Sequence, residues 1–247
     1  MTAIVEAAIL LGGASLVGSF IGFFVKRIPH RLNDIFLGFC AGMMLAASII
    51  CLALPAVEAA GQGGLWQVAL GIVAGAVLIS LLDKLTPHLH NLTGLEPEEH
   101  QNNQTINRVI LFVIAIAIHK LPEGMATGVA YDAANVANAD ALSLTIALQN
   151  IPEGLVIVTP LLVAGIRTWR IMTVALTVAC LEMAGVFIGY WIGSLSAVLL
   201  PPLMGVAAGA MLYVISDEMI PETHSHGYQK AATFAMILGF ITMLFIE

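Results

Sequence analysis

His-Lys-Leu-Pro-Glu-Gly at residues 119–124 is echoed by Gln-Asn-Ile-Pro-Glu-Gly at residues 149–154. Each motif lies inside an apolar stretch long enough to cross a bilayer, for which about 20 residues are needed. In each copy the first residue and the glutamate are four positions apart, so they share one helix face and can hold one ion together. The proline between them removes a backbone donor and frees the carbonyl of Ile118 or Leu148. Paired helices broken at the midplane in this way are typical of a binding site inside a membrane protein.

The rest of the chain surrounds these motifs with further apolar stretches. Of its 247 residues, 59% are hydrophobic and 10% are charged, whereas a soluble domain carries about 25% charged residues. This composition excludes an ordinary soluble enzyme. Eight stretches approach the length of a membrane span, and they cover residues 3–25, 35–56, 65–82, 109–131, 141–166, 171–192, 203–220 and 231–246. We therefore predict an all-α polytopic membrane protein in which residues 1–247 form one domain of eight transmembrane helices.

The basic residues predict the orientation of these helices. They lie at the odd-numbered connections, whereas the even-numbered connections hold none; they are Lys26, Arg27, Arg31, Lys84, Arg108, Arg167, Arg170 and Lys230. By the positive-inside rule the connections 1–2, 3–4, 5–6 and 7–8 face the cytoplasm and both termini lie outside. Because the chain is compact and shows no targeting extension, we expect it in a bacterial cytoplasmic (inner) membrane.

Charge, cysteines and histidines limit the other functions. The formal net charge of −7 and the lack of a basic stripe exclude nucleic acid as a partner. Cys40, Cys51 and Cys180 lie singly in apolar stretches and are expected to be small buried residues rather than disulfides or zinc ligands. A polar cytoplasmic loop is predicted at about residues 84–107, and it contains His88, His90 and His100. These histidines either bind metal, to collect or sense it, or are incidental residues of a solvated linker.

Ionisable residues near helix centres carry the predicted chemistry, because such groups are costly in hydrocarbon. The two motifs together supply one imidazole and three oxygen donors, from His119, Glu123, Gln149 and Glu153. This ligand set suits Zn²⁺, Fe²⁺, Mn²⁺, Co²⁺ or Cd²⁺ better than Mg²⁺ or Ca²⁺. Glu123, Glu153 and a third glutamate, Glu182, carry a formal charge of −3, and Lys120 adds +1. The remaining charge of −2 matches one divalent cation. The alternative is a buried ion-pair network that only fixes helix packing.

These residues resemble the ZIP (ZRT/IRT-like) metal transporters, whose fourth and fifth helices carry an HNxPEG-like motif and an H/Q-N/D-xPEG motif. The resemblance extends to Gly42-Met-Met-Leu-Ala-Ala-Ser48 and to Ile215-Ser-Asp-Glu-Met-Ile-Pro-Glu-Thr-His224, and it is closest to the prokaryotic GufA-like branch. It implies eight helices in which helices 4 and 5 lie between inverted three-helix repeats.

The resemblance also implies site residues beyond the two motifs. Met44 becomes a thioether ligand or, by its helical spacing, an ordinary core residue. A second metal position corresponds to Lys120, Asn150 and Glu182, but an ammonium has no lone pair for a metal while it stays protonated. We therefore predict a mononuclear site in which Lys120 pairs with Glu182 or Glu123. Exit-path ligands, or alternatively solvated helix-end acids, are Asp34, Asp217, Glu218, Glu222 and His224.

The function implied by the resemblance is uptake of a divalent metal, Zn²⁺ foremost, from outside towards the cytoplasm. The metal is the substrate, no catalytic cofactor is expected, and the sequence shows no ATP-binding pattern. The partners are the metal ion and the lipid bilayer, and the sequence does not decide whether the protein forms a homodimer. Two rival functions remain at this stage: an intramembrane zinc-dependent hydrolase, and a metal-free proton or organic-ion transporter.

Overall fold

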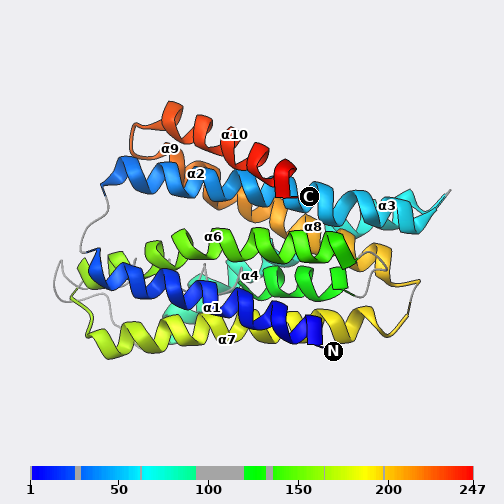
Figure 1. Cartoon of the computed structure of the whole chain (residues 1–247), viewed down its shortest axis with the longest axis horizontal. Helices are drawn as coiled ribbons and strands as arrows, with labels where there is room; N and C mark the ends of the chain where they lie inside the picture. The colour runs from blue at the N-terminus through cyan, green and yellow to red at the C-terminus, as the bar shows by residue number, and fades with distance from the viewer. Residues whose placement is uncertain are drawn as a thin grey trace.

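The computed structural model describes residues 2–25, 29–61, 63–92, 120–131, 136–163, 165–196 and 198–246. Every regular element among these residues is a helix (Figure 1). The elements are α1 (Thr2–Phe24), α2 (His30–Ala47), η1 (Ser48–Ala53), α3 (Leu54–Ala60), α4 (Leu65–Leu92), α6 (Val136–Val163), α7 (Thr168–Gly193), α8 (Leu200–Val214), η2 (Ile215–Met219), α9 (Ile220–His224) and α10 (Gln229–Ile246). Residues 120–131 are helical as well.

Helix length and composition make the chain an all-α polytopic membrane protein, as predicted. Within the described ranges, seven helices are long and apolar enough to cross a membrane; they are Thr2–Phe24, His30–Ala60, Leu65–Leu82, Asn138–Thr159, Thr168–Gly193, Leu200–His224 and Gln229–Ile246. The predicted fourth span, residues 109–131, is described from residue 120 onward, and its first part lies outside the described residues.

The helices pack in two groups that meet along α2 and α6. The first group contains α1, α6, α7 and the segment 120–131, and the second contains α2, α4, α8 and α10 (Figure 1). The largest contacts are α1 with α6, α4 with α8, α2 with α10, and α1 with α7. Exchanging α1 with α7, α2 with α8 and α4 with α10 maps the contact of α4 with α8 onto that of α2 with α10, and the contact of α1 with α7 onto itself. Because α1 and α7 run in opposite directions in Figure 1, this symmetry is that of two inverted three-helix repeats.

Small residues bring the helices of each group close together, which is how helices associate in lipid. A Cβ atom at Gly18 would overlap the backbone oxygen of Ile151 on α6, and one at Gly209 would overlap that of Ile72 on α4. Gly18 and Gly209 thus form small faces on the first and seventh predicted spans, against which neighbouring backbones pack. Gly13 differs, because nothing lies within 4 Å of the position that its Cβ would take.

The irregular helix turns are not where the sequence predicted them. Helix α6 continues without interruption through Pro152 from Val136 to Val163, so the expected break there is wrong. Instead, η1 and η2 are π-helical, and the N–H groups of Leu54 and Ile220 each donate to a carbonyl five residues earlier. Each wide turn leads into a proline near the start of the next helix, which has no N–H to continue the α-helical pattern.

Two further expectations need correction. Helix α4 continues to Leu92, so the predicted loop at about residues 84–107 begins in a helix; hydropathy marks where a span leaves the apolar core and does not mark where the helix ends. His100 lies outside the described residues. Cys40 and Cys51 are buried as expected, but Cys180 is exposed, because it lies on the face of α7 that turns away from the other helices.

Candidate metal site

Lys120 lies at the centre of a carboxylate cluster. Its Nζ atom is 2.7 Å from Glu123 Oε2, 2.5 Å from Glu153 Oε2 and 3.8 Å from Glu182 Oε1. It also donates a hydrogen bond to Asn150 Oδ1. Only 1% of Lys120 is exposed, so the side chain does not extend to a membrane interface. The two motif glutamates, which come from the segment 120–131 and from α6, therefore meet at one ammonium group.

Glu182 is held behind this cluster by neutral hydrogen-bond donors. Ser15 Oγ on α1 donates to Glu182 Oε2 at 2.8 Å. Asn150 Nδ2 donates to Glu182 Oε1 at 2.7 Å and to the backbone oxygen of Leu11 at 3.2 Å. A buried carboxylate is tolerated when its oxygens are paired in this way. Each oxygen of Glu182 accepts a hydrogen bond and the residue does not line the cavity next to the cluster, so in this arrangement it supports the cluster from behind.

Glu123 and Glu153 do open onto a cavity. Its volume is about 70 Å³, and it is lined by both glutamates, Lys120 and Met44, and further along by Glu218 and Glu222. Met44 is 1% exposed, so it is a core residue that also contributes to the cavity wall. Glu222 is exposed, and the cavity therefore connects the carboxylate cluster with the surface beside α9.

Gln149 is buried in the same region and lacks hydrogen-bond partners. It is 0% exposed, and neither Oε1 nor Nε2 has a partner among the described groups. Unpaired polar atoms of this kind are uncommon, and each needs an explanation such as an unoccupied ligand position. Gln149 lies one helical turn before Glu153 on α6, so both project from the same face.

The fourth expected ligand, His119, lies outside the described residues. Within the described ranges, no group of three or more His, Cys, Asp or Glu side chains is arranged to hold a metal ion. The structure thus brings Glu123, Glu153 and Met44 together at one cavity and places Gln149 nearby. It does not show the complete ligand set.

The expected exit-path residues lie in three different surroundings. Glu218 and Glu222 line the cavity, whereas Asp217 and His224 are exposed and are not part of its lining. Asp34 is 0% exposed and its Oδ1 lies 3.0 Å from His226 Nδ1.

Four residues in this region make contacts that the sequence did not predict. Ser15 contacts Glu182, and Cys40 donates through Sγ to the backbone oxygen of Gln149 at 3.7 Å. The rings of His30 and His226 are stacked with centroids 4.4 Å apart. These contacts join elements that are distant in the sequence. The one available signal was the clustering of His30 and His226 at predicted cytoplasmic connections.

Comparison with known proteins identifies the family. The model of the ZIP zinc transporter family matches residues 94–247. The zinc transporter ZIPB of Bordetella bronchiseptica is 39% identical over 96% of this chain and 80% of its own length. The chain belongs to the ZIP family. Among other relatives, the zinc transporter GufA of Myxococcus xanthus is 34% identical over 98% of this ZIP chain and 96% of its own, and ZIP11 of Homo sapiens is 30% identical over 95% and 93%.

Membership of the ZIP family confirms the resemblance predicted from the motifs, including the GufA-like branch. It also identifies a transporter and not an intramembrane hydrolase. The departure of this ZIP protein from the usual motif is Lys120, which stands where an asparagine is expected. The ammonium of that residue occupies the space between the carboxylates of Glu123, Glu153 and Glu182.

Proposed function

We propose that this ZIP protein carries Zn²⁺, and also Cd²⁺, Fe²⁺, Mn²⁺ and Co²⁺, across the membrane towards the cytoplasm. The observation that supports this proposal is the cavity onto which both motif glutamates open. It begins at Glu123, Glu153 and Met44 and ends at Glu218 and the exposed Glu222. Oxygen and sulfur donors therefore follow one another along this cavity. Such a row of donors allows an ion to move from one ligand set to the next.

The midplane ligands in this proposal are His119, Glu123, Gln149 and Glu153, with Met44 as a thioether donor. The two unpaired amide atoms of Gln149 support its inclusion, because a bound ion would satisfy the buried carbonyl oxygen. Imidazole with carboxylate and amide oxygens favours borderline divalent ions. Since these ligands must lose protons before they bind metal, affinity is expected to fall at low pH.

Lys120 limits this site to a single ion. Its ammonium holds the place of the second metal next to Asn150 and Glu182, and it has no lone pair to offer. The cluster of three glutamates and one lysine carries a formal net charge of −2. One divalent ion neutralises this charge, so the site needs no second cation.

The ion leaves along the second group of helices. In this proposal Glu218 and Glu222 are transient ligands on the exit path, and Asp34, Asp217 and His224 lie at its cytoplasmic mouth. The membrane is the bacterial inner membrane, with both termini outside. The positions of Arg31, Arg167, Arg170 and Lys230 support this orientation, because all four lie at the ends of helices that border the odd-numbered connections.

Metal uptake into proteoliposomes with an interior fluorescent indicator tests the proposal. Zn²⁺, Cd²⁺, Mn²⁺, Fe²⁺ and Mg²⁺ are compared in the native protein and in His119→Ala/Glu153→Ala, with Glu58→Ala as a control on the exposed surface of α3. Uptake of the borderline ions that the double variant abolishes and the control retains is expected. Unchanged Zn²⁺ uptake in His119→Ala/Glu153→Ala would rule out the midplane site, and no flux of any metal in the native protein would rule out transport.

A further inference from the structure

A second hollow lies on the outer surface, between α1 and α7. We call it the α1/α7 groove; its volume is about 510 Å³, within the range of about 300–1,000 Å³ typical of small-ligand pockets. Its floor contains the small buried residues Ser19 and Ala175, and its walls include Phe20, Phe23 and Met172. Phe20 is 61% and Met172 53% exposed. In a membrane-spanning chain these walls face lipid, so the groove is an apolar trough open to the bilayer.

The groove ends at a basic, aromatic rim where α7 begins. Arg167 and Arg170 are exposed and form no ion pair with a residue in the described ranges. Thr173, which lines the groove, lies one turn beyond Arg170 and bonds back to the carbonyl of Trp169. The ring of Trp169 is 60% exposed and lies 5.5 Å from Arg170 Cζ. Tryptophan and arginine at a helix end are typical of the membrane–water interface.

We propose that the α1/α7 groove binds one anionic phospholipid, with an acyl chain in the trough and the phosphate at Arg167 and Arg170. A free anion would leave the apolar walls without a contact. A neutral lipid would leave the two guanidinium groups without a counter-ion. An anionic phospholipid matches both parts. Arginine binds phosphate through paired hydrogen bonds, and basic pockets between transmembrane helices at the cytoplasmic side suit acidic head groups.

The position of the groove gives the lipid a structural consequence. Helices α1 and α7 also supply Ser15 and Glu182, which hydrogen-bond to each other behind the carboxylate cluster. A lipid seated between the same two helices therefore braces the helix pair that supports the metal site. The inference does not depend on which ion is transported, because it rests on the outer surface of the two helices.

Fluorescence quenching by brominated lipids tests this inference directly. The chain has three tryptophans, so Trp66→Phe/Trp191→Phe leaves Trp169 at the rim as the single reporter. This variant is reconstituted in phosphatidylcholine vesicles that contain brominated phosphatidylglycerol or brominated phosphatidylcholine at matched mole fractions. We expect the anionic lipid to quench Trp169 with about 30-fold higher apparent affinity, the preference that two basic residues near a membrane surface confer.

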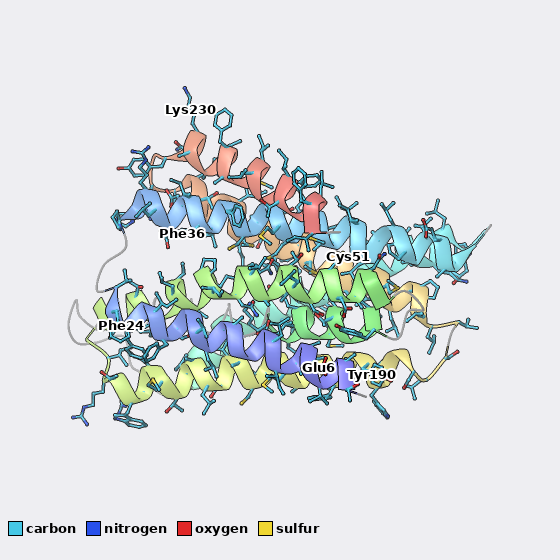
Figure 2. The ribbon with its side chains drawn as sticks, in the orientation of Figure 1. Glu6, Phe24, Phe36, Cys51, Tyr190 and Lys230 are labelled. Atoms are coloured by element: carbon cyan, nitrogen blue, oxygen red, sulfur yellow. The ribbon has the colours of Figure 1, made fainter. Side chains whose placement is uncertain are left out.

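Two sets of substitutions assign the effect to the groove. Arg167→Gln/Arg170→Gln is expected to abolish the preference for the anionic lipid. Thr173→Phe, which fills the trough from an exposed position, is expected to weaken quenching by both lipids. The matched control is Arg31→Gln/Lys230→Gln, which removes two charges at helix starts of the other group; Figure 2 shows Lys230 on α10, at the opposite edge of the molecule from α7. This control is expected to keep the preference.

Several results would overturn the inference. Equal quenching by the two lipids would exclude selectivity for an anionic head group. Equal loss of the preference in the control and in Arg167→Gln/Arg170→Gln would assign it to general surface charge. Displacement of the anionic lipid by inorganic phosphate alone would assign the arginines to a free anion. Thermal unfolding of each variant in detergent establishes that the compared proteins are folded.

Discussion

Replacing Lys120 with asparagine is expected to change both the stability of the metal-free protein and the number of ions that it binds. The ammonium lies within 4 Å of carboxylate oxygens from Glu123, Glu153 and Glu182, and it is 1% exposed. Removing one partner of a buried ion pair typically costs about 3–5 kcal/mol, because the remaining charge is left without compensation. Lys120→Asn is therefore expected to lower the free energy of unfolding of the metal-free protein by about that amount.

The same substitution changes the charge available to metal. In the native protein one divalent ion neutralises the formal −2 of the cluster, whereas in Lys120→Asn the cluster carries −3 and keeps −1 after one ion has bound. The asparagine oxygen also supplies a metal ligand where the ammonium supplied none. The variant is expected to bind two Zn²⁺ ions per chain in place of one.

Thermal unfolding in detergent, with and without Zn²⁺, and equilibrium dialysis with elemental analysis measure these two quantities. Lys230→Asn is the matched control, because Lys230 is exposed and its loss is expected to change stability by less than about 0.5 kcal/mol. A Lys120→Asn protein that is as stable as the native protein without metal, and that still binds one Zn²⁺, would refute the role assigned to this lysine.

Three smaller perturbations test other contacts. Gly209→Ala places a Cβ against a carbonyl of α4 and is expected to cost about 1–3 kcal/mol in thermal unfolding, whereas Gly13→Ala, with open space around it, is expected to cost nothing; equal effects would contradict the close packing of α4 and α8. Glu222→Gln is expected to slow Zn²⁺ uptake while the bound Zn²⁺ stays at one per chain, and loss of bound Zn²⁺ would place this residue in the midplane site. Asp34→Asn and His226→Ala disrupt one shared contact, so their double variant is expected to lose about 0.5–3 kcal/mol less than the sum of the single losses; strictly additive losses would show that the pair contributes no stability.

Much of the fold follows from short-range sequence patterns. The apolar stretches located the helices because a span must satisfy its backbone internally and be long enough to cross the hydrocarbon layer. The echoed motifs located Glu123 and Glu153 because ionisable groups in hydrocarbon are rare without a function. Those two residues do meet at one cavity with Lys120.

Other features depend on contacts that a linear pattern does not contain. The hydrogen bond from Ser15 to Glu182 joins residues from two separate helices. The sequence pointed to Glu182 as an ionisable group in an apolar stretch, but Ser15 on its own is an ordinary polar residue there. Helix α6 continues through Pro152, because neighbouring helices can satisfy the backbone group that a proline frees, and the π-helical turns lie in two other spans. The extension of α4 to Leu92 lies beyond the apolar stretch, where hydropathy carries no information about helix ends.

Anomalous diffraction at the zinc absorption edge, from crystals of the Zn²⁺-loaded protein, tests the midplane site most directly. We predict a single strong peak per chain in this region, between the segment 120–131 and α6 and in contact with Glu123 and Glu153. Two peaks within the carboxylate cluster would contradict the role of Lys120. A chain whose zinc peaks all lie away from Glu123 and Glu153 would contradict the midplane site itself.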